Sequence, residues 1–419
     1  MLIEYGSVFI TLAVVLGLYM TWGIGANDVA NALGTSVGSG AISIKQAIII
    51  AAIFEFSGAF IAGGNVTKTI RKGIIDPTPI LGNPEILVWG MLSSLLAAAL
   101  WLTVASWMGW PVSTTHSIIG AIVGFAMVGI GVDAVNWSKI GTIVVSWVVS
   151  PMVGGTFSFL IMRSIQRFIL DTDRPFRNAQ RYAPLYIFFV GFLISLVTLF
   201  KGLKHLEIEL NIPQSFLVAL AFGSIIALIG RFLIDRLRMK EAESVHDQFT
   251  QIEKIFGVMM LFTACAMAFA HGSNDVANGI GPMAAVVSVV QSGGEMAQKS
   301  ALPLWILVVG GCGIILGLAT FGYRVIQTIG TKITELVPTR GFSAELAAAA
   351  TVVLASRTGI PVFTTHIAVG AVVGVGLARG IGALDLRVIG GIFMSWVITL
   401  PVGALLSIFF FFFFRGVFL

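Results

Sequence analysis

The stretch Gly-Ala-Asn-Asp-Val-Ala-Asn at residues 25–31 returns as Gly-Ser-Asn-Asp-Val-Ala-Asn at residues 272–278. A second stretch also occurs twice: Gly-Trp-Pro-Val-Ser-Thr-Thr-His at residues 109–116 and Gly-Ile-Pro-Val-Phe-Thr-Thr-His at residues 359–366. The copies are 247 residues apart for the first stretch and 250 for the second, so both belong to one duplication. The chain therefore consists largely of two related halves.

The composition around these motifs is that of a membrane protein. Of the 419 residues, 57% are hydrophobic and only 11% are charged, whereas soluble domains are about 25% charged. A water-soluble core could not hide so much apolar surface at this length, and a disordered chain would be far more polar. The formal charge of +5 indicates no nucleic-acid partner, because the basic residues gather in a few short loops. Two cysteines are too few for a disulfide framework.

The apolar runs have the length of membrane-spanning helices, which need about 20 residues. A β-barrel would require alternation of apolar and polar residues, which segments such as 219–229 lack. We therefore expect an all-α membrane protein with about 12 transmembrane helices. The predicted spans are residues 7–24, 46–64, 86–108, 112–130, 140–162, 184–200, 213–234, 254–271, 302–323, 343–360, 361–379 and 388–414.

Basic residues set the expected orientation, since cytoplasmic loops are enriched in lysine and arginine. Two clusters flank the central pair of spans: Arg163, Arg167, Arg174, Arg177 and Arg181 in the first, and Arg231, Arg236, Arg238, Lys240 and Lys254 in the second. With both clusters in the cytoplasm, both termini lie outside the cell membrane, in the extracellular or periplasmic space. The loop with Lys68, Arg71 and Lys72 would then also lie outside, against the rule.

The copies should enter the membrane from opposite sides, because an odd number of predicted spans, seven, separates them. Inverted repeats with broken helices build secondary transporters, whose site lies near the membrane midplane. The expected division is a first inverted repeat at 1–162, basic segments flanking a two-helix hairpin at 163–253, and a second inverted repeat at 254–419. Duplication could also give a simple two-fold scaffold or a channel.

Asp28 and Asp275 occur at the ends of apolar runs, where a carboxylate is costly. Each is followed three residues later by an asparagine, Asn31 or Asn278, on the same helical face. Oxygen ligands of this kind suit a hard cation such as Na⁺. The alternative is helix capping, a role that Asn and Asp favour.

Pro111 and Pro361 cannot continue a helix, so each predicts a helix restart. The hydroxyl groups that follow would lie at helix N-termini, which attract anions. These residues are Ser113, Thr114, Thr115, Thr364 and Thr365. Alternatively, such hydroxyls bond to their own helix backbone.

Other polar residues have several interpretations. His116 and His366 could bond to the anion, relay a proton or serve packing, which we favour. His271 lacks a counterpart in the first copy, which has Ile24, and is expected outside the symmetric core. Glu55, in mid-span, could form a second cation site or carry a proton. Glu345 lies near a predicted span start, where it would complement the helix dipole.

Two aspartates and an anion near one midplane would repel each other strongly at low dielectric. Cations between them would remove that repulsion, so that each ion binds well only with the other. A cation–anion symporter follows from this reasoning.

The paired motifs resemble the signature of the inorganic phosphate transporter (PiT) family, sodium/phosphate symporters among them, and residues 69–75 match it too. The resemblance implies a cation-coupled phosphate symporter with two inverted repeats, in which Asp28, Asp275, Glu55 and Glu345 are functional acids. The coupling ion is Na⁺ in some relatives and H⁺ in others.

We therefore predict a symporter that moves inorganic phosphate into the cell on a Na⁺ gradient, by alternating access around a midplane site. Alternatives are a proton-coupled phosphate, metal–phosphate or sulfate symporter, an anion channel, and an intramembrane enzyme, which no catalytic constellation supports. The partners are phosphate, Na⁺ and the lipid bilayer; no cofactor is expected, and a homodimer is left open. The predicted phosphate-binding residues are Ser113, Thr114, Thr115, Thr364, Thr365, Asn27 and Asn274. The predicted Na⁺-binding residues are Asp28, Asp275, Asn31, Asn278 and Glu55, with Glu345, His116 and His366 as accessory residues.

Overall fold

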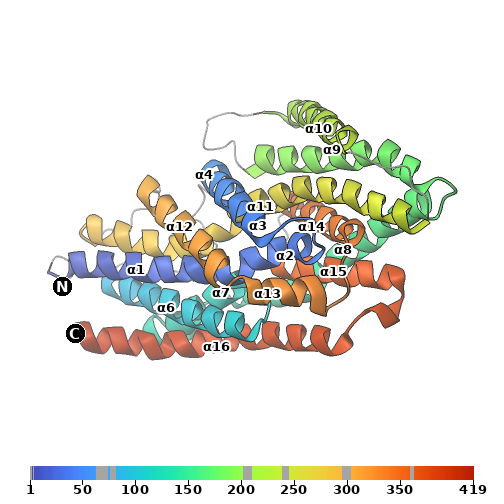
Figure 1. The fold of residues 1–419 in the computed structure, drawn as a ribbon. Coiled ribbons are helices and arrows are strands. Elements are labelled where there is room, and N and C mark those ends of the chain that lie inside the picture. The colour runs from blue at the N-terminus through green and yellow to red at the C-terminus, as the bar shows by residue number, and fades with distance from the viewer. Residues whose placement is uncertain are drawn as a thin grey trace.

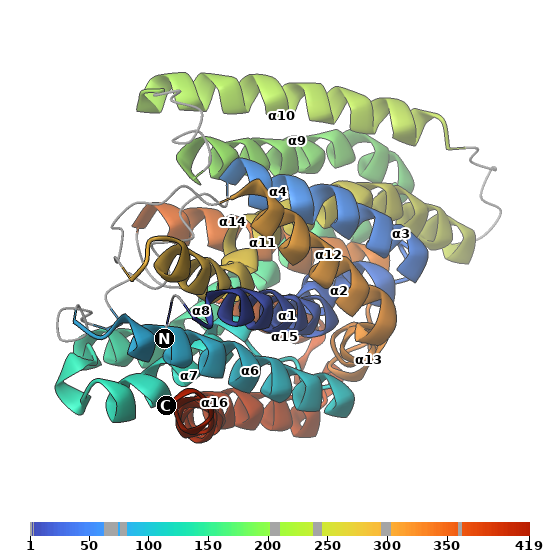
Figure 2. The ribbon, with the colours of Figure 1, turned by 90° about the vertical axis from the view of Figure 1, so that its left-hand side faces the viewer.

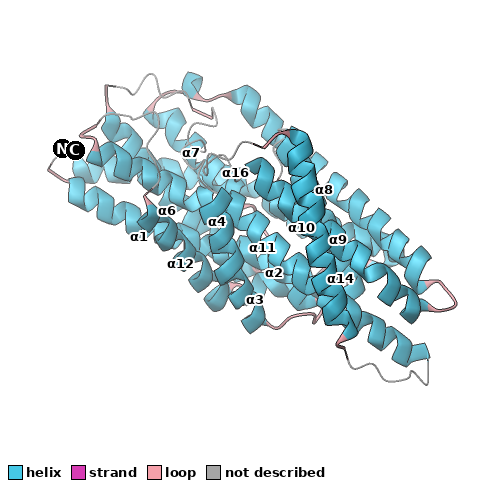
Figure 3. Ribbon diagram, turned by 90° about the horizontal axis from the view of Figure 1, so that it is seen from above, coloured by secondary structure: helices cyan, strands magenta, loops and turns pink. Residues whose placement is uncertain are grey.

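The computed structural model describes residues 2, 4–62, 74–75, 82–201, 210–237, 245–294, 303–358 and 363–419. Within these residues the protein is helical, with one isolated bridge between Ile75 and Val135 and no named strand (Figure 3). Pro361, residues 68–73, Arg238 and Lys240 lie outside the described residues.

In the described part of the chain, eight helical segments are long and apolar enough to cross a bilayer, and two shorter apolar helices accompany them. The prediction of an all-α, multi-pass membrane protein is thus confirmed, whereas the count of about 12 spans stays a prediction. The helices are α1 (Gly6–Ile24), α2 (Ala30–Gly38), α3 (Ile44–Ile50), α4 (Phe56–Ala62), α6 (Pro84–Met108), α7 (Thr114–Gly129), α8 (Trp137–Ile165), α9 (Pro175–Lys201), α10 (Ile212–Asp235), α11 (Val245–Gln291), α12 (Leu304–Phe321), α13 (Tyr323–Gln327), α14 (Pro338–Thr358), α15 (Thr364–Arg379) and α16 (Leu386–Phe418).

The Asn-Asp motifs lie inside continuous helices. A single π-helical turn, Gly25–Val29, joins α1 to α2, and the second motif belongs to the 47-residue helix α11. The expectation that spans end before the motifs, at residues 24 and 271, is therefore wrong, and so is the capping alternative. The polar side chains of the motifs form hydrogen bonds with buried polar partners. Each helix can therefore continue past the end of its apolar run.

The helix break behind Pro111 is present as predicted. Helix α6 ends at Gly109, whose φ of 70° only glycine adopts easily. Helix α7 then begins at Thr114, and the Ser113 side chain caps it by accepting a hydrogen bond from the backbone N–H of His116. Helix α15 begins at the corresponding residue, Thr364.

Each helix that carries a Thr-Thr motif packs against a helix of the other half. Helix α7 of the first half packs on α16 of the second, and α15 of the second half packs on α8 of the first. A Cβ atom at Gly120 would lie 2.4 Å from the Leu400 carbonyl oxygen, and one at Gly370 would lie 2.2 Å from that of Pro151. The repeated glycines therefore permit the same close helix approach twice.

Helices α9 and α10 form a pair at one edge of the molecule, far from α16 (Figures 1 and 2). Helix α10 exposes large apolar side chains, among them Leu217 (66% exposed) and Leu228 (69%), as a lipid-facing helix would. The two chain termini lie together at the opposite end from the α8–α9 turn (Figure 1).

Candidate functional site

The two aspartates of the repeated Asn-Asp motif, Asp28 and Asp275, contact threonines at the starts of both α7 and α15 in the interior of the protein. Thr114 donates a hydrogen bond to Asp28 Oδ2 (2.5 Å), and Thr365 donates to Asp28 Oδ1. In the mirrored arrangement, Thr364 donates to Asp275 Oδ2 (2.8 Å) and Thr115 lies 3.4 Å from Asp275 Oδ1. Each carboxylate thus receives one hydroxyl from its own half and one from the other. The fold brings together four of the five predicted hydroxyl residues with both predicted aspartates.

The fifth hydroxyl residue, Ser113, does not reach either aspartate through a hydrogen bond among the described residues. Its side chain accepts from the His116 backbone N–H at 3.3 Å, and its carbonyl accepts from Ser117. Ser113 therefore fixes the start of α7, which in turn aims Thr114 and Thr115 at the carboxylates.

His271 occupies the centre of the acidic residues. Its Nε2 atom lies 3.3 Å from Asp275 Oδ2 and 3.8 Å from Asp28 Oδ2, while its Nδ1 atom lies 3.0 Å from Glu55 Oε2. The expectation that His271 lies outside the symmetric core is wrong, because this single histidine lies close to the aspartates of both halves. The sequence signal is that His271 lies four residues before Asp275, on the same helical face.

These groups are arranged as ligands of a cation could be. One ligand atom each from Asp28, His271 and Asp275 lies within 4.8 Å of the others, and all three residues are buried. Glu55 Oε1 and Asn31 Oδ1 are also buried, and neither atom has a hydrogen-bond partner among the described residues. Oxygen-rich surroundings of this kind suit hard cations.

Glu55 reaches this cluster because two backbones come very close. A Cβ atom at Gly272 would lie 2.2 Å from the carbonyl oxygen of Glu55, and one at Gly25 would lie 1.9 Å from that of Ile314. The glycine that opens each Asn-Asp motif thus admits a helix of the other half. Glu55 itself ends a π-helical turn, Ala51–Glu55, and is 2% exposed.

The asparagines divide into two kinds. The Asn278 amide donates to Thr115 (2.8 Å), and the Asn274 amide donates to Asp275 (3.0 Å), so both belong to the cluster. Asn27 instead holds the α6–α7 break: its amide donates to the Trp110 carbonyl at 2.9 Å, and its oxygen accepts from the Val112 N–H at 3.0 Å. These contacts show how Asn27 positions the threonines of α7.

His116 and His366 pack against aromatic rings. The Trp147 indole donates to His116 Nε2 at 2.9 Å, and the His366 ring stacks on Trp396 with centroids 3.6 Å apart. The two histidine rings meet edge to face at 4.8 Å. This geometry supports the packing interpretation.

Glu345 forms a second buried polar cluster. Its carboxylate accepts hydrogen bonds from Ser36 (2.5 Å), Thr35 (2.6 Å) and Thr263. It lies beyond the first turn of α14, so the proposed interaction with the helix dipole does not explain it. Its hydroxyl partners come from α2 and α11, far away in the sequence, and carried no signal of their own.

Comparisons with known proteins point to one family. The model of the phosphate transporter family matches residues 24–407. A protein of Haemophilus influenzae named as a phosphate permease is 50% identical over 418 residues, covering 99% of both chains. The inorganic phosphate transporter 2-1 of Arabidopsis thaliana, a chloroplastic protein, is 44% identical and covers 94% of this chain, which spans 70% of that relative.

A solved structure described as the sodium-dependent phosphate transporter has the same fold. It superposes with a TM-score of 0.87 at 38% identity, covering 98% of this chain and 99% of that one. These similarities indicate phosphate transport rather than enzymatic catalysis. The family match over most of the chain, together with relatives of high identity and full coverage, shows that this protein belongs to the phosphate transporter family.

Proposed function

We propose that the protein is a symporter that moves inorganic phosphate into the cell on a Na⁺ gradient. The observation that supports it best is the crossed hydrogen bonding of Asp28 and Asp275 to threonines of both halves. The sodium-dependent transporter of the same fold adds support for Na⁺ as the driving ion.

Na⁺ and phosphate binding would be coupled because Na⁺ ions and threonine hydroxyls compete for the same carboxylates. The hydroxyl protons of Thr114, Thr364 and Thr365 point at carboxylate oxygens, so they are unavailable to an anion. Na⁺ ions bound to Asp28 and Asp275 would replace these protons as partners of the carboxylates. The hydroxyls could then rotate and donate to phosphate, whose charge the cations also offset. Each ion thereby raises the affinity for the other.

Transport would proceed by alternating access, because the site is closed in this conformation. Asp28 and Asp275 are each 2% exposed, and Thr114 and Thr365 are 0% and 1% exposed. In transporters with inverted repeats, movement of one bundle against another opens such a site to either side in turn. The helix breaks before α7 and α15 place the threonines where such a movement would separate them from the carboxylates.

The residue roles follow the predicted division. The proposed phosphate-binding residues are Thr114, Thr115, Thr364, Thr365 and Asn274 as ligands, together with Ser113 and Asn27, which hold the start of α7 in place. The proposed Na⁺ ligands are Asp28, Asp275, Asn31, Asn278 and Glu55, with Glu345, His116 and His366 as accessory residues. We further propose two inverted repeats at 1–162 and 254–419, both termini outside the cell membrane, and the basic segments of 163–253 in the cytoplasm. A homodimer is compatible with the exposed apolar helices.

A proton-coupled symporter is the second candidate, and the contact between His271 and Glu55 favours it, since such a pair can carry a proton. Uptake of radiolabelled phosphate into proteoliposomes separates the two. An inward Na⁺ gradient should drive accumulation at equal pH, and a pH gradient without Na⁺ should not. Accumulation on the pH gradient alone would contradict Na⁺ coupling. Competition by sulfate, or a strict need for a divalent metal, would identify the sulfate or metal–phosphate alternatives.

A further inference from the structure

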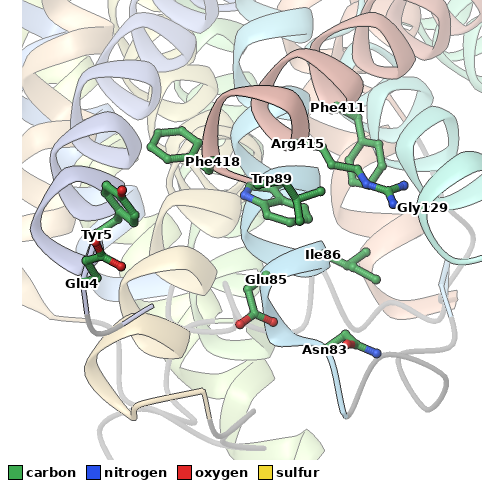
Figure 4. A pocket seen from close by; sticks show the side chains of 11 residues that line it. Glu4, Tyr5, Asn83, Glu85, Ile86, Trp89, Gly129, Phe411, Arg415 and Phe418 are labelled. Carbon is green, nitrogen blue, oxygen red and sulfur yellow. The ribbon is translucent and has the colours of Figure 1, made fainter. Parts of the chain in front are cut away.

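A pocket of about 780 Å³ lies beside the chain termini, between the ends of α1, α6 and α16 (Figure 4). Its volume is typical of small-molecule sites, which range over about 300–1,000 Å³. Its lining combines aromatic and aliphatic side chains with charges of both signs. Since it is formed by the ends of helices long enough to cross the bilayer, the pocket would lie at the depth of the lipid headgroups when these helices span the membrane.

The lining contains a buried hydrogen-bond donor without a partner. Trp89 is only 5% exposed, and its indole Nε1 atom is buried with no hydrogen-bond partner among the residues that the structure describes. Leaving such a donor unsatisfied is costly, so a rotation of the indole that presents its N–H to an acceptor in the pocket would be favourable. Figure 4 shows Trp89 in the middle of the pocket lining.

The charges of the pocket are separated in space. Arg415 lies on one side of Trp89 and Glu4 on the other, with Glu85 below (Figure 4). None of these three charged side chains forms an ion pair within the part of the chain that the structure describes. Two carboxylates and one guanidinium disfavour a free phosphate ion, but suit a ligand that carries both a phosphate and a cation.

Lipid-facing side chains continue from the pocket along α16. Phe411 and Arg415 line the pocket from one face of α16, and Phe412, three residues before Arg415, is 51% exposed on the neighbouring face, whereas Phe409 and Phe413 point to the far side of the helix from Phe411. On the Phe412 side, the phenylalanine run of α16 offers an apolar surface on which acyl chains can lie, next to the polar pocket that would receive the headgroup.

We infer that this pocket binds the headgroup of a phospholipid with a primary ammonium group, of the phosphatidylethanolamine type. Arg415 and the Trp89 N–H donate to the phosphate, as charged and indole donors do. The ammonium group donates to Glu4 and Glu85, which a quaternary choline group cannot do because it has no N–H. The acyl chains lie along the phenylalanine run of α16.

Native mass spectrometry of the purified full chain tests this inference. The protein is mixed with equal amounts of phosphatidylethanolamine, phosphatidylcholine and phosphatidylglycerol with identical acyl chains. The wild type should retain phosphatidylethanolamine preferentially, and millimolar inorganic phosphate should not displace it. Arg415→Gln and Trp89→Phe should each reduce its retention about tenfold, since each removes a donor to the phosphate.

Matched variants make the result interpretable. Arg387→Gln changes an exposed arginine at the other end of α16 and should retain the lipid as the wild type does. Both pocket variants should still take up phosphate in liposomes without phosphatidylethanolamine, which shows that they are folded. Equal retention in wild type, Arg415→Gln and Trp89→Phe would overturn the inference. So would a preference for phosphatidylglycerol or phosphatidylcholine, or displacement by inorganic phosphate, which would identify a free anion as the occupant.

Discussion

The hydroxyl of Thr365 donates a hydrogen bond to the carboxylate of Asp28, across 337 positions of the sequence. The same relationship in mirror image joins Thr115 to Asp275. Each half of the protein therefore supplies a donor to the acid of the other half. Replacement of either aspartate should therefore disturb the threonines at the starts of both α7 and α15.

Replacement of either aspartate should abolish Na⁺-dependent uptake. Asp28→Asn and Asp275→Asn keep the side-chain volume but remove the charge that would bind Na⁺. We expect a loss of about 100-fold or more in uptake, with normal membrane insertion. Na⁺ should also raise the melting temperature of the purified wild type, compared with choline at equal ionic strength, and should not raise that of the variants. Wild-type uptake in either variant would remove the case for a cation site there.

Replacement of a cross-half threonine should weaken phosphate binding more than Na⁺ binding. Thr365→Val preserves shape and removes one donor, which should raise the phosphate KM about tenfold. Thr351→Val is the control, because the Thr351 hydroxyl is equally buried but bonds to the Ala347 carbonyl of its own helix. Equal effects of the two variants on the phosphate KM would show that the hydroxyl acts only through packing.

Removal of the central histidine should destabilise the protein as well as stop transport. In His271→Leu, Glu55 loses its partner at 3.0 Å, and Asp28 and Asp275 lose the group between them. Breaking the buried contact between Glu55 and His271 by removing one partner costs about 3–5 kcal/mol, while Asp28 and Asp275 keep their threonine donors. His271→Gln retains a donor amide and should recover part of the stability. Thermal unfolding and uptake measured on both variants give the two readouts, and an unchanged melting temperature in His271→Leu would contradict the central placement of His271.

A methyl group added at Gly120 or Gly370 should destabilise the contacts between the two halves. Gly370→Ala places a Cβ 2.2 Å from the Pro151 carbonyl oxygen, and Gly120→Ala places one 2.4 Å from that of Leu400. Overpacking of this kind costs about 1–3 kcal/mol. Gly141→Ala, in α8, meets nothing within 4 Å and serves as the control. A similar loss of thermal stability in all three variants would argue against the close helix approach.

The sequence predicted much of the site because the motifs occur twice. Duplication singled out Asp28, Asp275 and the paired threonines, and proline predicted the helix break that aims Thr114 at the acid. The duplication could not predict His271, because this histidine occurs in one copy only and yet contacts the acids of both halves. The apolar runs also predicted helix ends at the polar motifs. The length of an apolar run does not show that buried hydrogen-bond partners allow α11 to continue through the second motif.

The cluster around Glu345 illustrates the other limit of sequence reasoning. Thr35, Ser36 and Thr263 are unremarkable in sequence, and only the fold brings their hydroxyls to one carboxylate. The phospholipid pocket is similar, since Trp89 and Arg415 are typical interface residues whose proximity depends on the packing of α6 and α16.

The most direct test of the central claim is the affinity of the purified protein for phosphate, measured by calorimetry in NaCl and in choline chloride at equal ionic strength. If Na⁺ on the aspartates releases the threonine hydroxyls, phosphate should bind about tenfold or more tightly in NaCl. Phosphate should raise the affinity for Na⁺ by the same factor. Equal phosphate affinity in the two salts would contradict the account.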